Sequence, residues 1–371
     1  MKKYRLLKEH FKSERGVVAI LVGIGIVLLV SMLALAIDVA YTWVTRNELQ
    51  NVSDASSLAA ARKLGDIYGD LSNPLSDEQV AAIRQPAIDM GSANRAGGKG
   101  IVIDSSDILI GIWDTASKTF TDTLSWPSTD PSLKPKAVKV IARRDSSTYG
   151  NGPITTFFAG IMGQPTKEVS AKAVANLSGV CIAKPPIPVG ISYYRFNNPN
   201  YCDTPIRLNP TNDPASCAGW NTYFEGSHSA ETLKKILEQM TARTYAIPEV
   251  QAGKDSLNFT GGTLGNAAFS RFLELFNAMR VLDQGENGPL DFDPPGHPDT
   301  WTTYVPVYEW NDCSNPNDNI LIVGFAMITI DHVLPPPDKI IDAHIVCDQS
   351  VPERGGCEDF GVTSQIPGLV Q

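Results

Sequence analysis

Six cysteines are the residues of this 371-residue chain with the plainest chemistry. An even number of cysteines, all from position 181 onward and none near the N-terminus, favours disulfides formed in an oxidising compartment over free thiols, the alternative. The shortest loops favour Cys202 with Cys217 and Cys347 with Cys357, which leaves Cys181 with Cys313. No Cys-x-x-Cys pair occurs, so neither a metal nor a cofactor is expected.

Two histidines lie next to acids, an arrangement that can supply a general base and its orienting carboxylate. They are found in Asp331-His332 and in Asp342-Ala343-His344. A serine hydrolase would also need a nucleophile elbow, and no Gly-x-Ser-x-Gly is present. We therefore interpret these histidines as surface residues and expect no catalytic site and no small-molecule substrate. A membrane-tethered extracytoplasmic hydrolase is the alternative.

The segment Val17–Ile37 is uncharged and apolar, and as a helix it would extend roughly 30 Å, enough to cross a bilayer. A basic tip, residues 1–15, precedes it. Because cationic flanks remain on the cytoplasmic side, we expect a single-pass protein with its N-terminus in the cytoplasm and the rest outside. Ala34-Leu35-Ala36 resembles a signal-peptidase site, but the apolar run is longer than a signal peptide requires. Cleavage there would make the chain a secreted binding protein starting at Ile37.

Small residues four apart within the span are typical of helices that pack closely in lipid. The candidate packing residues are Ala19, Gly23, Ala36 and Ala40. The ends of the span carry the candidate anchor residues, among them two amphipathic rings suited to the membrane interface. These anchor residues are Arg15, Gly16, Asp38, Tyr41 and Trp43.

The charge of the chain is unevenly divided between its two ends. The formal net charge is −9, and the first fifteen residues carry +4, so the part after the span carries −13. A strongly acidic exterior argues against nucleic acid as a partner.

The helix is expected to continue beyond the membrane. No glycine or proline occurs from Arg46 to Leu64, and Leu49, Val52, Ser56 and Ala59 recur at helical spacing. Membrane helix and extension together predict one rod of about 70 Å ending near Lys63.

The rest of the chain predicts an α+β architecture. We expect a helix at 76–90, strands at 101–103, 108–113, 119–124, 137–142 and 168–173, and a short buried helix at 154–162. A proline-rich connector at 181–188 suggests a boundary. Beyond it we expect helices at 230–240 and 266–282 and paired strands at 320–330 and 340–346.

Three stretches resemble the N-terminal module of the TadE/TadG-like Flp-pilus-assembly proteins. They read ERGVVAI from Glu14, LALAID from Leu33 and LQNVSDASSLAAA from Leu49. The resemblance implies a component of the bacterial apparatus that builds Flp pili, located in the inner membrane with a periplasmic head. Its implied partners are the lipid bilayer and other Tad/Flp pilus-assembly proteins or pilin-like helices.

The resemblance implies the pilin-like part of the expected fold, and the cysteines and the proline-rich connector add the C-terminal domain. The fold is a long membrane-spanning helix with a pilin-like antiparallel sheet head, followed by a disulfide-stapled α+β domain. The expected domains are the tip (1–15), the helix (16–64), the head (65–180) and a C-terminal domain (181–371).

One departure from type IV pilins bears on the role. Pilins are cut after a glycine and carry a glutamate five residues later. Here Gly16 is in place, but the fifth residue is Leu21. The sequence therefore favours an uncleaved accessory or anchoring subunit over a major pilin.

Overall fold

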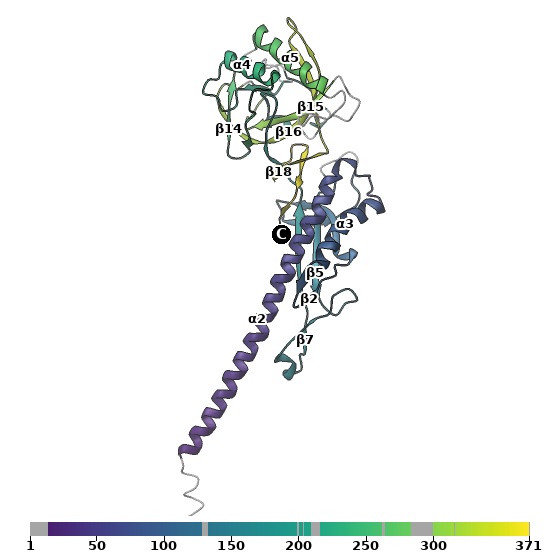
Figure 1. Cartoon of the computed structure of the whole chain (residues 1–371), viewed down its shortest axis with the longest axis vertical. Helices are drawn as coiled ribbons and strands as arrows, with labels where there is room; N and C mark the ends of the chain where they lie inside the picture. The colour runs from purple at the N-terminus through teal and green to yellow at the C-terminus, as the bar shows by residue number, and fades with distance from the viewer. Residues whose placement is uncertain are drawn as a thin grey trace, which may run out of the picture.

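The computed structural model describes residues 14–127, 133–198, 200–202, 204–208, 216–261, 264–282, 300–314 and 316–370. Most of the basic tip, residues 1–13, lies outside the described residues. The molecule is elongated: one helix runs from the N-terminal end into the head, and a second globular part caps the far end (Figure 1).

Helix α2 (Glu14–Asp66) is the single rod that the sequence predicts, with 53 residues and a length of about 80 Å. From Val18 onward the apolar side chains of its first half are exposed, apart from Ala34. From Leu49 onward a stripe is buried against the head, and Leu49, Val52 and Ser56 belong to it as expected. A chain without internal glycine or proline between the two halves has no local reason to break there.

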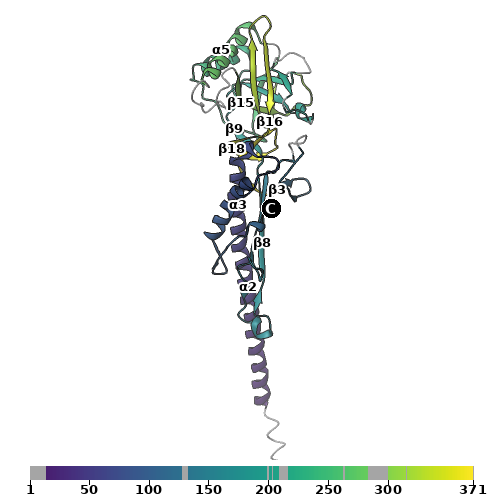
Figure 2. The same ribbon diagram turned by 90° about the vertical axis from the view of Figure 1, so that its right-hand side faces the viewer.

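The head is an antiparallel sheet with α2 and α3 (Asp77–Ser92) packed on it, and β8 runs alongside α2 (Figure 2). The strand order is β20-β8-β5-β3-β4. The strands are β3 (Ile108–Asp114), β4 (Thr119–Asp122), β5 (Ala137–Arg144), β8 (Val169–Asn176) and β20 (Gly368–Leu369). Ser76 begins α3 through a capping box with Gln79, which fixes the helix start near the expected position.

Two expectations in the head are wrong. Residues 101–103 form no strand, because they pair with no neighbouring strand. Ile101 and Ile103 are buried beneath α3, so the alternating apolar pattern at 101–103 indicates burial and not a strand. Residues 154–162 form no buried helix. They begin a hairpin of β6 (Ile154–Thr155) and β7 (Thr166–Lys167) with a 3₁₀ turn, η4 (Ala159–Met162), at its tip. Gly163, with φ of 87°, ends that turn in a left-handed conformation that glycine readily adopts.

The far part of the chain contains a seven-stranded sheet in the order β11-β17-β16-β14-β12-β10-β15. Because β15 also pairs with β16, the strands from β16 to β15 close into a five-stranded barrel. The strands are β10 (Val189–Ser192), β11 (Pro205–Arg207), β12 (Ala218–Asn221), β14 (Ser256–Thr260), β15 (Trp301–Tyr308), β16 (Asn319–Leu334) and β17 (Ile340–Val346). The predicted pairing of β16 with β17 is confirmed.

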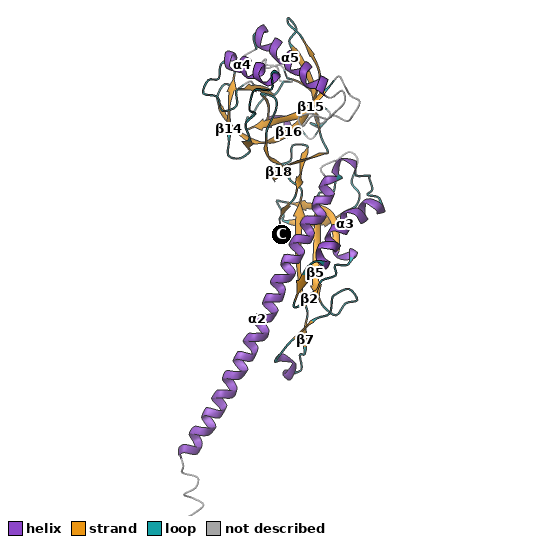
Figure 3. Ribbon diagram, in the orientation of Figure 1, coloured by secondary structure: helices purple, strands orange, loops and turns teal. Residues whose placement is uncertain are grey.

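Helices α4 (Ala230–Thr241) and α5 (Asn266–Leu282) form where the sequence predicts them. They pack on each other at the end farthest from the N-terminus, and α5 also contacts β15 and β16 (Figure 3). The barrel and these helices share one large hydrophobic cluster, and α2, α3 and the head sheet share a second.

A small sheet, in the order β13-β9-β18-β19, lies between the barrel and the head sheet, and its buried side chains belong to the barrel's hydrophobic cluster (Figure 1). Its strands are β9 (Gly179–Ala183), β13 (Val250–Gln251), β18 (Gln349–Cys357) and β19 (Val362–Ile366). After β19 the chain returns to the head, where β20 pairs with β8. The C-terminus therefore lies beside the head sheet, not beyond the barrel (Figure 1). The chain is thus an α+β protein with a long N-terminal helix, as expected.

Candidate membrane anchor and its contacts with the head

The first half of α2 is long and apolar enough to cross a membrane, and almost all of its surface is exposed. Its one hydroxyl donor, Ser31, is satisfied inside the helix, because its Oγ donates to the carbonyl of Val27 at 2.8 Å. Such back-bonding removes the need for water, which a bilayer core does not supply.

The four candidate packing residues all lie on this exposed segment. Gly23 has no atom of the chain within 4 Å of the position of an added Cβ. The pairs Ala19–Gly23 and Ala36–Ala40 are rotated by about 100° from each other around the helix axis. They therefore form two small-residue faces, and neither contacts the head.

Asp38 lies one residue beyond the apolar run, and among the candidate anchor residues whose side chains the structure describes it accepts the most hydrogen bonds. Its side chain is 6 % exposed. Its carboxylate accepts hydrogen bonds from three successive backbone amides of the β6–β7 hairpin: Phe157 at 2.7 Å, Phe158 at 3.0 Å and Ala159 at 2.7 Å. A carboxylate that accepts from consecutive amides acts as the cap of the turn that follows. Asp38 thus joins the end of the span to a loop some 120 residues later.

The two aromatic anchor residues face different surroundings. The ring of Tyr41 meets the ring of Phe157 edge to face, with centroids 5.6 Å apart, and its hydroxyl donates to the carbonyl of Gly97 at 3.2 Å. Trp43 is 64 % exposed. Arg15 and Gly16 belong to the first turn of α2, where side chains lie outside the described part of the structure.

A buried arginine next to this junction was not identified from the sequence. Arg144, at the end of β5, donates to the carbonyls of Ala96 and Gly152, each at 2.7 Å. Glu48 on α2 accepts the amide of Gly97 at 2.6 Å, so the β1 (Arg95–Ala96) and β2 (Lys99–Gly100) hairpin is held from both sides. In the sequence, the only indication of this buried arginine is that the segment forming β5 ends in two arginines, Arg143 and Arg144.

Closer to its C-terminal end, α2 is bonded to the head sheet through small and polar residues. Ser53 donates to the carbonyl of Ala171 at 3.2 Å and accepts the amide of Ala142 at 3.3 Å. Gln50 donates to the carbonyl of Lys172 at 3.1 Å. At the top of the rod, Ser350 donates to the carbonyl of Gly65 at 2.7 Å. The outer half of the helix is therefore bonded to the head sheet through Gln50 and Ser53 and, at its end, to β18 of the small sheet.

All six cysteines form disulfides, but the pairing expected from loop length is wrong. The bonds are Cys181–Cys357, Cys202–Cys347 and Cys217–Cys313. Strand pairing selects them. Cys357 lies opposite Gly179 on β9, which brings it near Cys181. The pairing of β11 with β17 brings Cys202 and Cys347 together. Strands β12 and β15 both flank Ile191 of β10, which places Cys217 near Cys313.

The two histidines of interest form cross-strand pairs with acids on β16 and β17. His332 lies 2.8 Å from Asp342, and His344 lies 3.1 Å from Asp331. Within the described residues, each imidazole has only a carboxylate as recorded polar partner, with no hydroxyl or thiol nucleophile in hydrogen-bond contact. That same part of the chain holds no cluster of three or more metal-ligating side chains.

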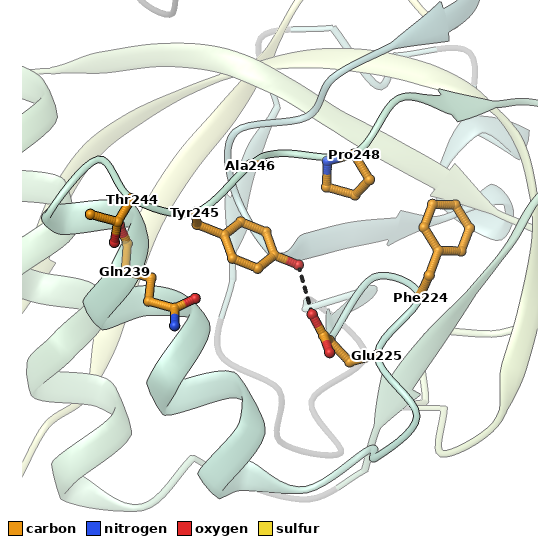
Figure 4. Close-up of a pocket in the computed structure, with 7 residues that line it drawn as sticks. All are labelled: Phe224, Glu225, Gln239, Thr244, Tyr245, Ala246 and Pro248. Carbon is orange, nitrogen blue, oxygen red and sulfur yellow. Dashed lines mark hydrogen bonds between the residues drawn. The ribbon is translucent and has the colours of Figure 1, made fainter.

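A shallow hollow of about 380 Å³ lies beside α4 (Figure 4). Tyr245 donates to Glu225 across it at 3.4 Å. Burial, reinforced by the charge of Glu225, raises the pKa of Tyr245 to about 12. The hydroxyl is therefore a hydrogen-bond donor at neutral pH, and the hollow has the character of a polar surface recess. Its lining residues are Phe224, Glu225, Gln239, Thr244, Tyr245, Ala246 and Pro248.

These features define a class: an α+β head built on the outer half of one long helix whose inner half is apolar enough to span a bilayer. Comparison with known families specifies it further. Residues 16–63 match the family described as "Putative Flp pilus-assembly TadE/G-like". Residues 51–175 match the one described as "Putative Tad-like Flp pilus-assembly".

Residues 16–175 are therefore similar to Tad/Flp pilus-assembly proteins, in agreement with the resemblance seen in the sequence. The barrel and its helices lie outside both matches. No curated protein and no solved structure matches the chain.

Proposed function

We propose that this protein is a pilin-like accessory subunit that anchors a folded head to the inner membrane beside the growing Flp pilus. Its contribution is structural. The apolar half of α2 is the anchor, the small-residue faces contact other pilin-like helices, and the barrel domain presents a surface to pilus or envelope partners.

The observation that carries this proposal is the continuity of α2. The same helix holds the apolar segment and the stripe that packs on the head sheet, with no break between them. A continuous helix transmits position and orientation from membrane to head. A flexible tether, which is sufficient for a membrane-bound enzyme, would instead contain glycine or proline at this point.

In the proposed topology the basic tip is cytoplasmic and the head, with its three disulfides, lies outside the membrane. With Leu21 in place of the pilin glutamate, the chain remains uncleaved at Gly16. Intact-mass measurement of the membrane-extracted protein tests this directly. A mature N-terminus at Val17 or at Ile37 would contradict the uncleaved anchor.

The role itself is tested by complementation of a deletion strain. We expect the strain to lose Flp pili and to recover them with the full chain. A matched variant that carries a cleavable signal peptide in place of residues 1–37 exports the same head without its anchor, and we expect no pili from it. Piliation that is normal in the deletion strain, or restored by the anchorless head, would refute the proposal.

A further inference from the structure

The β6–β7 hairpin, residues 154–167, exposes an unusual number of large apolar side chains at its tip. Ile161 is 83 % exposed, Met162 is 89 % exposed and Phe157 is 62 % exposed; Phe158 is also exposed. No charged residue occurs between Asp145 and Lys167. In water, such a cluster costs about 25 cal/mol for each Å² of apolar surface left unburied. A contiguous exposed apolar patch of this kind marks a contact surface.

The position of the hairpin indicates what that contact is. The three amide bonds to Asp38 place Phe157, Phe158 and Ala159 beside the first residue after the apolar run of α2. From there the hairpin extends along α2 toward its N-terminal end, away from the head sheet (Figure 1). Its tip therefore lies at the level of the apolar half of α2, where the large apolar side chains are exposed and Ala34 is 9 % exposed.

The hairpin is held rigidly in this place. Arg144 binds the carbonyl of Gly152 at 2.7 Å, just before β6, and Asp38 caps the turn. Inside the hairpin, the Thr156 hydroxyl donates to the carbonyl of Gln164 at 2.6 Å. A tip fixed by these bonds cannot fold back to cover its own apolar side chains.

The surface above the tip has the opposite character from the rest of the exterior. The segments that adjoin the span exit, residues 41–50, 94–100 and 143–172, contain seven basic and three acidic residues in an exterior that is otherwise strongly acidic, and of the seven only Arg144 is buried. Arg46 and Lys172 line a hollow between α2 and the head sheet, and both are exposed. Basic residues above an apolar tip match phosphate groups above acyl chains.

We propose that the β6–β7 hairpin is a second membrane contact, in which Phe157, Ile161 and Met162 insert into the outer leaflet of the bilayer that α2 spans. Asp38 is the positioning residue that sets its depth. Two points of insertion would fix the tilt and the rotation of the head, which one helix alone leaves free. This inference rests on the proposed anchor topology.

The test uses the full chain in phospholipid nanodiscs, with a nitroxide attached to Ile161→Cys. Oxygen concentrates in acyl chains and a nickel chelate in water, so their relative collision rates with the label report its depth. Leu29→Cys in the span is the lipid reference, and Phe224→Cys, an exposed apolar residue on the barrel domain, is the water reference. We expect Ile161 to resemble Leu29, with a nickel accessibility several-fold below that of Phe224.

Each other outcome is decisive. If Leu29 is in lipid and Ile161 matches Phe224, the hairpin contact is wrong while the anchor stands. If Leu29 is also in water, both are wrong. Asp38→Asn, which keeps the size but removes the charge, is expected to raise the nickel accessibility of the label at Ile161 several-fold. No change would refute the positioning role of Asp38.

Because an introduced cysteine could exchange with the three native disulfides, a second experiment measures the depth of the hairpin without added thiols. In nanodiscs with brominated acyl chains, Ile161→Trp is expected to add fluorescence that the bromines quench, whereas Phe224→Trp adds fluorescence that they do not. Equal quenching of the two variants would overturn the inference.

Discussion

The hydroxyl of Ser350 donates to the carbonyl of Gly65 across 2.7 Å of space and 285 residues of sequence. This bond lies where α2 ends and β18 begins, so the C-terminal strands clasp the top of the rod. Together with the carboxylate of Asp38, which bonds the β6–β7 hairpin, it fixes the outer half of the helix at both ends.

The clasp leaves no room for a side chain at Gly65, which gives a first prediction. An added Cβ would lie 3.0 Å from Cα of Gln365 and 3.2 Å from Cδ2 of Leu177. Gly65→Val should therefore reduce the free energy of unfolding by about 1–3 kcal/mol, as overpacking does. Thermal unfolding measures it. Gly226→Val, at a glycine with nothing within 4 Å, is the control and should change little. Equal effects would show that the clasp is not tightly packed.

Reduction of the disulfides should affect one part of the molecule only. All three bonds lie outside the hydrophobic cluster of α2, α3 and the head sheet. Loss of a native disulfide costs about 2–5 kcal/mol, so reduction should destabilise the barrel domain strongly. Hydrogen exchange under reducing conditions should show faster exchange in β16 and unchanged protection in β5. Uniform loss of protection would mean that the two parts unfold as one.

Glu353 on β18 provides a pH prediction. Burial raises the pKa of Glu353 above its ordinary value. The positive charge of Lys184 opposes this shift, and the negative charge of Glu249 adds to it. The folded state thus binds this proton more tightly than the unfolded state. The resulting stabilisation is present below the ordinary pKa and is lost as the pH rises through the raised pKa. Glu353→Gln should raise the melting temperature at about pH 7 and not at about pH 4. Glu231→Gln, at an exposed position of α4, is the control. A gain that is the same at both pH values would contradict the assignment.

Gly23 tests whether the small-residue face of the span meets another helix. Because an added Cβ at Gly23 contacts nothing in this chain, Gly23→Leu should leave the fold intact. If the face packs in the membrane, the variant should weaken association by about 1 kcal/mol or more. Cross-linking yield with co-expressed pilus-assembly proteins measures this. Leu29→Ile, which preserves size within the span, is the control. An unchanged yield for Gly23→Leu would exclude this face as the contact.

Elements that depend on nearby residues could be predicted from the sequence. The rod α2, helices α3, α4 and α5, and the β16–β17 pair all form where apolar spacing, caps and breakers placed them. The buried stripe through Leu49 and Val52 was visible for the same reason, because helical spacing repeats within a few residues.

Features that depend on contacts between distant segments could not be predicted. Residues 154–162 have the composition of a core helix, yet they form part of an exposed hairpin, because their amides bond to Asp38 and the turn ends at Gly163. The three disulfides follow strand neighbours, not loop length. The partners of Asp38 lie about 120 residues away, so no local pattern marks them.

The sequence by itself determined that this protein has one apolar helix long enough to span a membrane, that the helix continues into an α+β head, and that it resembles the Tad pilus-assembly proteins. Those properties reside in short-range periodicity and composition. The tertiary structure alone decided which cysteines meet, that five strands close into a barrel, and that Asp38 holds an apolar hairpin beside the span. Strand register and long-range packing set these, and both arise only when distant segments are brought together.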